Sequence, residues 1–146
     1  MAVRGGRLRV LLVEDDPGDV LMTREAFEER GEQLEVVNDG VEALAYMRRE
    51  GGYSAAARPD LVVLDLNLPR RSGHEVLDDI KSDPMLRDIP VVVLTTSAAP
   101  EDVLASYRHH ANAYVTKPVD FDAFAAAIRQ IDDFFTEVAS LPPRAA

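Results

Sequence analysis

Four apolar residues, Leu61-Val62-Val63-Leu64, run directly into Asp65-Leu66-Asn67-Leu68-Pro69. A short apolar run that is rich in valine and followed by a turn signal predicts a β-strand buried on both faces. Asp65 would then lie at the carboxyl end of this strand, which is where ligands collect in open α/β sheets. We therefore expect chemistry at Asp65, with further groups delivered to it from neighbouring strand ends.

The alternation of strand and helix extends outward from Asp65 to both ends of the chain. Short apolar runs predict further strands over residues 8–13, 34–37, 89–94 and 113–115. Continuous apolar strands between amphipathic helices indicate an α/β domain with a parallel sheet covered on both faces. Each predicted strand is followed by a helix-start signal, and these signals are Asp16-Pro17, Asp39 with Glu42, Ser72 with Glu75, Pro100, and Asp120.

Apolar spacing predicts which side of each helix faces the core. We expect Val20, Leu21 and Phe27 to face inward on the first helix, and Val41, Leu44 and Met47 on the second. The last helix, from Phe121 to about Val138, carries a broader apolar arc than one sheet face needs. Its residues form an inward stripe of Phe124, Ile128, Ile131 and Phe135, widened by Phe121, Phe134 and Val138.

The length of 146 residues suits one domain with a sizeable core. We expect a flexible N-terminus over residues 1–7, a single domain over 8–138, and a C-terminal tail over 139–146 that frays from Leu141. No sequence for a second domain follows the last helix, so the domain is expected to act alone.

Composition excludes several classes of protein. The chain has no cysteine, which removes disulfide frameworks and thiolate sites. It has no apolar run near the roughly 20 residues of a membrane helix, and Arg9 interrupts the only N-terminal apolar segment, so a cytoplasmic location is favoured. The net charge of -10, from 16 basic and 26 acidic residues, disfavours nucleic-acid binding but permits a divalent-cation site.

Polar residues follow four of the predicted strands. They are Glu14-Asp15-Asp16, Asp65, Thr95-Thr96 and Lys117. Because the carboxyl ends of parallel strands meet at one edge, the carboxylates should crowd together and repel one another. A bound Mg²⁺ would relieve that repulsion, and the lysine and hydroxyl groups add donors for phosphate oxygens. This edge is therefore suited to phosphoryl transfer onto a carboxylate nucleophile.

Taken in order, these residues resemble the motifs of response-regulator receiver domains of two-component signalling, the chemotaxis-regulator-like family. The resemblance covers roughly residues 8 to 138 and implies a doubly wound, flavodoxin-like (β/α)5 fold with five helices and five parallel strands in the order 2-1-3-4-5. The matching segments are Leu12-Val13-Glu14-Asp15-Asp16-Pro17, Leu64-Asp65-Leu66-Asn67-Leu68-Pro69 with Gly73, Val93-Leu94-Thr95, and Tyr114-Val115-Thr116-Lys117-Pro118.

The resemblance also implies a role for each matching residue. Asp65 corresponds to the phosphoacceptor, and Lys117 to the lysine that pairs with the phosphoryl group. Asp15 corresponds to a direct Mg²⁺ ligand, Glu14 to an acid that acts on the metal through water, and the Asn67 carbonyl to a third protein ligand. Two residues correspond to a switch, namely Thr95, whose hydroxyl contacts the phosphoryl group, and Tyr114, whose ring turns inward after phosphorylation.

Partners follow from the same resemblance. A sensor histidine kinase would donate the phosphoryl group, and the segments Glu14–Val20, Leu94–Ser97 and Lys117–Asp120 are similar to those of regulators paired with phytochrome-type kinases. Output would be a protein contact rather than DNA binding. The broad apolar arc of the last helix favours a homodimer through helix 4, strand 5 and helix 5, the alternative being a helix that wraps its own core.

The chain departs from the family pattern at two positions. Thr96 stands where many receiver domains have a small alanine or glycine. His110 stands where family members commonly have a glycine in a left-handed helix end, a conformation that histidine adopts at some cost. The resemblance further implies a cis peptide bond between Lys117 and Pro118.

Three other functions fit parts of the pattern. A phosphatase of the haloacid-dehalogenase type also uses an aspartate nucleophile, but it carries the nucleophile after its first strand and a second acid two residues on, where this chain has Asn67. A passive adaptor of receiver fold would not need the acidic, threonine and lysine set. An FMN-binding flavodoxin shares the topology, but Glu14-Asp15-Asp16 would repel phosphate where a phosphate-binding loop is needed.

Overall fold

A computed structural model describes residues 7–144 of the chain. Five parallel strands form one sheet in the order β2-β1-β3-β4-β5, which confirms the predicted topology. Each strand is short and mainly apolar, and all five end at the same edge of the sheet. The strands are β1 (Arg9–Val13), β2 (Gln33–Val37), β3 (Leu61–Leu64), β4 (Val91–Thr95) and β5 (Ala113–Thr116).

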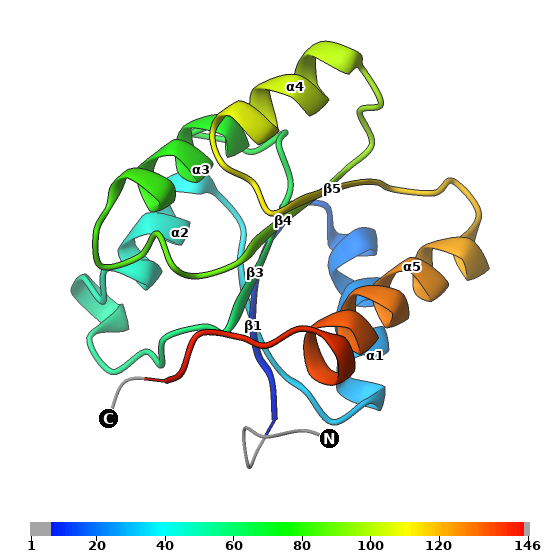
Figure 1. Cartoon of the computed structure of the whole chain (residues 1–146), viewed down its shortest axis with the longest axis horizontal. Helices are drawn as coiled ribbons and strands as arrows, with labels where there is room; N and C mark the ends of the chain where they lie inside the picture. Colours follow the sequence, from blue (N-terminus) through cyan, green and yellow to red (C-terminus); the bar gives the residue numbers. More distant parts are fainter. Residues whose placement is uncertain (1–6, 145–146) are drawn as a thin grey trace.

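Five helices cover the sheet on both faces (Figure 1). Helices α1 and α5 pack together on one face, and α2, α3 and α4 lie along the other. The helices are α1 (Pro17–Glu29), α2 (Gly40–Met47), α3 (Gly73–Ser82), α4 (Pro100–Arg108) and α5 (Phe121–Asp133), and short helical turns follow α2 and α5 at η1 (Gly51–Tyr53) and η2 (Phe134–Val138).

The predicted capping residues begin four of these helices. The side chains of Asp16, Asp39, Ser72 and Asp120 each accept a hydrogen bond from a backbone N–H in the first turn, and Ser72 forms a complete capping box with Glu75. Because each cap lies immediately after a strand or its loop, it sets where the chain leaves the carboxyl edge of the sheet.

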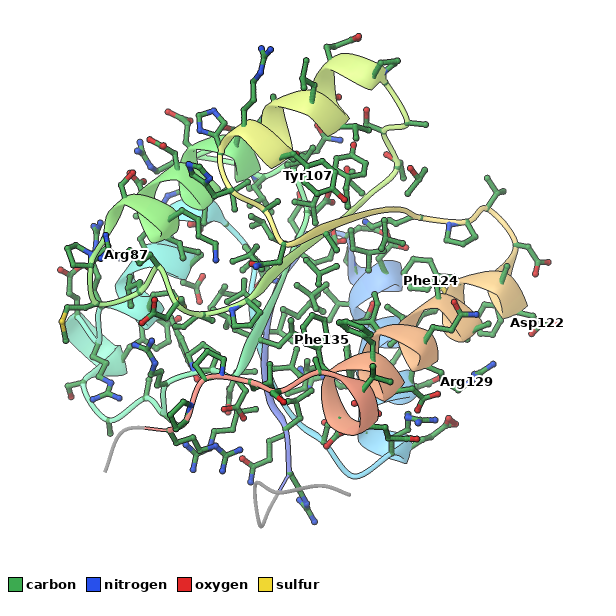
Figure 2. All side chains as sticks on the ribbon, viewed as in Figure 1. Arg87, Tyr107, Asp122, Phe124, Arg129 and Phe135 are labelled. Atoms are coloured by element: carbon green, nitrogen blue, oxygen red, sulfur yellow. The ribbon has the colours of Figure 1, made fainter. Side chains whose placement is uncertain are left out.

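Two apolar clusters make up the core, one on each face of the sheet. The first lies under α2 and α3, and the second lies under α1 and α5. Figure 2 shows Phe124 and Phe135 directed toward the sheet, whereas Asp122 and Arg129 lie on the outer side of α5. The predicted inward stripe of Phe124, Ile128, Ile131 and Phe135 is buried, and Phe121, Phe134 and Val138 are exposed.

Two of the residues expected to face inward are in fact exposed. Leu21 is 57% exposed on α1, and Val41 is 41% exposed on α2. The inward side of α1 is occupied instead by Thr23, Ala26 and Phe27. A small polar residue and an alanine fill this face because α1 packs closely against α5, so apolar character alone was a poor guide to its orientation.

The C-terminal segment packs back onto the domain. Leu141 contacts the core cluster beneath α1 and α5, and the Arg144 guanidinium pairs with both carboxylate oxygens of Asp60, at 3.1 and 2.6 Å. The fraying expected from Leu141 onward is therefore not seen over residues 141–144, because a buried carboxylate at the start of β3 binds the segment. Of the lead-in expected over residues 1–7, all but Arg7 lies outside the described residues.

No helix within residues 7–144 combines the length and the hydropathy that crossing a bilayer requires.

Candidate functional site

The carboxyl edge of the sheet gathers the predicted polar residues in one place. Glu14 directly follows β1, Asp65 follows β3, Thr95 ends β4 and Lys117 follows β5. Parallel registry aligns these ends, with Val13 beside Leu64 and Thr95 beside Thr116. The order of the strands therefore brings together residues that are distant in the sequence.

Lys117 is the centre of the cluster. Its ammonium lies 2.5 Å from Glu14 Oε1, 2.8 Å from Asp19 Oδ2 and 3.2 Å from Asp65 Oδ2. Burial is the largest single influence on this lysine and opposes its charge. The hydrogen bonds that the ammonium donates to Asp19 and Glu14, together with the negative charges of Glu14 and Asp65, outweigh burial, so the pKa of Lys117 is raised above its ordinary value. The ammonium is therefore a permanent positive charge beside Asp65.

Glu14 is a buried carboxyl group in a crowded anionic setting. Burial, with the charge of Asp65 adding to it, raises the pKa of Glu14 to about 7, although Lys117 and the Asp16 N–H act in the opposite direction. The Asp16 N–H donates to Glu14 Oε2 at 3.1 Å. Without a further cation, the site therefore holds more carboxylates than its single lysine neutralises.

Three carboxylates at this edge fit a divalent cation. Glu14, Asp15 and Asp65 each offer an oxygen, and these oxygens lie within 4.8 Å of one another. Asp15 is exposed, whereas Glu14 and Asp65 are buried, so the set opens toward solvent on one side. Hard oxygen ligands of this kind suit Mg²⁺, and the excess negative charge noted above gives such an ion a physical reason to bind.

Asn67 and Thr95 lie beside this cluster. The Asn67 N–H donates to Asp65 Oδ1 at 3.4 Å, which places Asn67 in the loop directly above the acid. Thr95 is fully buried, and its hydroxyl oxygen has no hydrogen-bond partner among the described residues. Buried hydroxyl groups are normally paired, so this one is poised for a group that enters the site.

Tyr114 lies farther from Asp65, on β5. Its hydroxyl donates to the Ser97 carbonyl at 2.8 Å, and its half-buried ring packs against the core on the α2 and α3 face. The side chain thus joins β5 to the loop between β4 and α4. Thr116, two residues on, contacts the same carbonyl at 3.4 Å.

Gly73 sets the position of the Asp65 backbone. A Cβ atom at Gly73 would lie 2.3 Å from the Asp65 carbonyl oxygen and 2.5 Å from the Leu66 Cα, far inside contact distance. The first turn of α3 therefore rests directly on the end of β3, and only glycine permits that approach. The sequence motif contained this glycine, but its reason is visible only in three dimensions.

Two conformational expectations have different outcomes. His110 has a φ of 71°, so it adopts the left-handed conformation expected of the glycine that it replaces. The peptide bond between Lys117 and Pro118 is trans rather than cis, because none of the described peptide bonds is cis. The Lys117 ammonium reaches Asp65 with this bond in the trans form.

Asp19 is the site residue that sequence reasoning missed. It occupies the first turn of α1, a position where an acidic side chain is also favoured by the helix N-terminus. A usable signal was available, since a helix that begins directly after β1 points its first turn toward the same sheet edge as Glu14. The lysine contact could not be read from residue order.

Comparisons with known proteins place the chain in a family. The family model described as "Response regulator receiver domain" matches residues 10–129. Response regulator Rcp1 of Synechocystis sp. is 41% identical over 135 residues, covering 91% of this chain and 92% of that protein.

Two solved structures extend the comparison to three dimensions. The phosphorylated cyanobacterial phytochrome response regulator RcpA has a TM-score of 0.91 at 43% identity, with 94% of this chain and 99% of that chain covered. The Mn(2+)-bound form of Rcp1 has a TM-score of 0.87 at 41% identity, with 91% and 97% covered. The chain belongs to the response-regulator receiver domain family, and its relatives include phytochrome-associated regulators.

Proposed function

We propose that this protein accepts a phosphoryl group on Asp65 from the phosphohistidine of a sensor histidine kinase. The observation that carries the proposal is the pairing of the buried Asp65 carboxylate with the Lys117 ammonium, at 3.2 Å, beside the two further acids Glu14 and Asp15. A nucleophile, a fixed positive charge and a set of metal-ligand oxygens together suit transfer onto a carboxylate.

The residues divide the work of the transfer. An Asp65 oxygen forms the new O–P bond while the P–N bond to the donor histidine breaks, and its electron pair stays on the imidazole nitrogen. Lys117 offsets the charge of the transferring oxygens, and the unpaired Thr95 hydroxyl donates to one of them. Glu14, Asp15, Asp65 and the Asn67 carbonyl would hold Mg²⁺, which supplies further positive charge against the repulsion between carboxylate and phosphoryl oxygens.

The proposed switch is the pair Thr95 and Tyr114. Once the Thr95 hydroxyl is drawn to the phosphoryl group, the loop that follows β4 is biased toward one arrangement, and Tyr114 is bonded to that loop through the Ser97 carbonyl. The surface of α4, β5 and α5 then changes its affinity for a protein partner. A net charge of -10 supports an output through protein contact rather than DNA binding.

The kinase that we propose is of the phytochrome type, because RcpA is named as a cyanobacterial phytochrome response regulator and the similarity covers nearly the whole chain. A histidine kinase takes its phosphoryl group from ATP, so we expect the transfer to occur in the cytoplasm. The composition of the sequence favours the same location. A phytochrome-type kinase labelled with γ-³²P-ATP should transfer label to the wild type and to Asp122→Asn, at an exposed acid in the first turn of α5, but not to Asp65→Asn. Label on Asp65→Asn, or equal labelling by an unrelated kinase, would contradict the proposal.

A homodimer through α4, β5 and α5 forms the second part of the proposal. Leu104 and Tyr107 on α4 and Phe121 on α5 are large apolar side chains that remain exposed in a single copy, and Tyr107 is labelled in Figure 2. Light scattering should give a dimer mass with acetyl phosphate, and Leu104→Lys should give a monomer. Leu21→Lys, at a similarly exposed apolar position on α1, serves as the control. A wild type that is monomeric both with and without acetyl phosphate would contradict the proposed dimer.

A further inference from the structure

The Lys117 ammonium has no donor to spare. An ammonium group carries three N–H donors. In this structure three carboxylates lie within hydrogen-bond distance of its nitrogen, namely Glu14 at 2.5 Å, Asp19 at 2.8 Å and Asp65 at 3.2 Å. A phosphoryl oxygen that arrives at Asp65 must therefore displace one of the existing partners before Lys117 can donate to it.

Asp19 differs from the other two acids in origin and in exposure. Glu14 and Asp65 extend from strand ends, whereas Asp19 extends from the first turn of α1. The Asp19 side chain is 20% exposed, compared with 3% for Glu14 and 8% for Asp65. Its backbone N–H donates to the Asp16 side chain at 3.1 Å, which fixes the position from which the carboxylate reaches Lys117.

Exposure decides which partner is released at the lowest cost. If Lys117 left Glu14, a buried carboxylate would lose its nearest cation, and the desolvation of that acid would go uncompensated. If Lys117 left Asp19, water could take the place of the ammonium beside the Asp19 carboxylate, because one fifth of the Asp19 side chain already faces solvent. Asp19 is also closer to the ammonium than Asp65 is, so it competes effectively in the unphosphorylated protein.

We propose that Asp19 is a positioning residue that holds the Lys117 ammonium in the unphosphorylated site and competes with the incoming phosphoryl oxygen for it. The inference rests on the proposed phosphorylation of Asp65. Asp19 acts only through Lys117, and it does not touch the transferring group. The transfer step is unchanged, since an O–P bond forms at Asp65, the bond from phosphorus to the donor breaks, and the donor keeps the electron pair.

A simpler explanation is that Asp19 only stabilises α1 through its position at the helix N-terminus. That explanation predicts that loss of the Asp19 charge affects the phosphorylation rate no more than loss of a neighbouring charge does. Asp16 provides the matched comparison, because Asp16→Asn removes one charge from the start of the same helix, while the asparagine oxygen still caps the helix and accepts from the Asp19 N–H that positions Asp19. The described structure gives the Asp16 side chain no hydrogen bond or ion pair with Lys117.

The test compares wild type, Asp19→Asn and Asp16→Asn by two measurements. The first is the initial rate of adduct formation with acetyl phosphate and Mg²⁺, followed by intact-protein mass. The second is the ¹⁵N resonance of the Lys117 ammonium in the metal-free, unphosphorylated proteins, which reports the contact itself without any reaction.

Competition predicts that Asp19→Asn raises the rate about three- to ten-fold over wild type, while Asp16→Asn changes it less than about two-fold. It also predicts that the Lys117 resonance shifts in Asp19→Asn only. Equal rates in the two variants, a slower Asp19→Asn, or an unchanged Lys117 resonance would overturn the role of Asp19 while leaving phosphorylation itself intact. A wild type that forms no adduct with acetyl phosphate or with a kinase would instead overturn the proposed function, and the competition with it.

Discussion

Lys117 Nζ lies 3.2 Å from Asp65 Oδ2, although the two residues are 52 positions apart in the chain. Strand β4 lies between the strands that carry them, and the parallel registry of the sheet brings both strand ends to one edge. Both side chains are buried, so the interaction is only weakly screened by solvent. The fold therefore holds a permanent positive charge beside the proposed phosphoacceptor.

Lys117→Met should impair both stability and phosphorylation. The substitution leaves Glu14 and Asp65 buried without their cation, so the free energy of unfolding should fall by about 3 kcal/mol in the absence of divalent cations. The rate of adduct formation should fall at least about 100-fold, because the developing charge loses its fixed donor. Urea denaturation and intact-protein mass measure the two effects. Arg129→Met, at an exposed position on α5, should change neither, and a stable, reactive Lys117→Met protein would refute the role of this lysine.

Gly73→Ala should disturb the position of Asp65. Its Cβ would lie 2.3 Å from the Asp65 carbonyl oxygen, so either α3 or the end of β3 must move, at a cost of about 2–4 kcal/mol in unfolding free energy. Phosphorylation should slow by at least about ten-fold, because small displacements of a nucleophile are costly. Gly18→Ala is the control, since its Cβ would meet only Asp16 Oδ2 at 3.7 Å. Equal effects of the two alanine substitutions would contradict this account.

Stability should depend on pH through Glu32. Burial, followed by a hydrogen bond with Asp132, raises the pKa of Glu32 to about 7 from an ordinary value of 4.5. A carboxyl group whose pKa is higher in the folded state stabilises the fold fully below the unfolded value, and that contribution is lost as pH rises through about 7. Three further charged groups lie near Glu32. Arg30 pairs with Asp132 at 2.5 Å, and it also pairs with Asp133.

The measurement is urea denaturation of wild type and Glu32→Gln without divalent cations. Between about pH 5 and about pH 8, the wild type should lose on the order of 1 kcal/mol relative to Glu32→Gln, after allowance for partial exposure of Glu32. Glu29 is an exposed acid on α1, and the free energy of unfolding of Glu29→Gln should change with pH in the same way as that of the wild type. A difference between wild type and Glu32→Gln that stays constant with pH would rule out a titration of Glu32 in this range.

Arg144→Gln should loosen the C-terminal segment. Asp60 is buried at the start of β3 and accepts from both the Arg144 guanidinium and the Arg9 N–H. Removal of the guanidinium charge should cost about 1–3 kcal/mol of unfolding free energy and expose the segment around Leu141 to proteolysis. Arg87→Gln, at an exposed position, should change neither the free energy of unfolding nor the proteolysis of the segment. Unchanged stability and unchanged cleavage would show that this ion pair does not hold the segment.

The parallel sheet, the helix caps and the grouping of polar residues at one sheet edge were predictable from the residues themselves, whereas the strand order followed from the resemblance to receiver domains. Apolar runs such as Leu61–Leu64, alternating with amphipathic helices, are typical of a covered parallel sheet, and caps such as Asp16 or Ser72 have a purely local cause. Strand ends in such a sheet necessarily share an edge. The grouping of Asp65 with Lys117 therefore followed from local signals together with one topological rule.

Features that depend on side-chain reach and on packing were not predictable. Asp19 reaches Lys117 from a helix, and Arg144 reaches Asp60 across 84 positions, so neither contact leaves a periodic signal in the sequence. Apolar character alone placed Leu21 and Val41 inward, whereas both are exposed in the structure. On α1, the face that packs against the core and α5 is formed by Thr23, Ala26 and Phe27 instead. The left-handed conformation of His110 was accessible only through comparison with the glycine usual at that position.

The mass of the intact protein after incubation with acetyl phosphate tests the central claim most directly. Wild type with Mg²⁺ should gain a single adduct of about 80 Da, the mass of HPO₃, on Asp65. Asp65→Asn should gain none, and wild type without a divalent cation should gain none. An adduct that persists in Asp65→Asn, or a folded wild type that gains no adduct with either acetyl phosphate or a phosphorylated histidine kinase, would contradict the claim and favour a passive adaptor of the same fold.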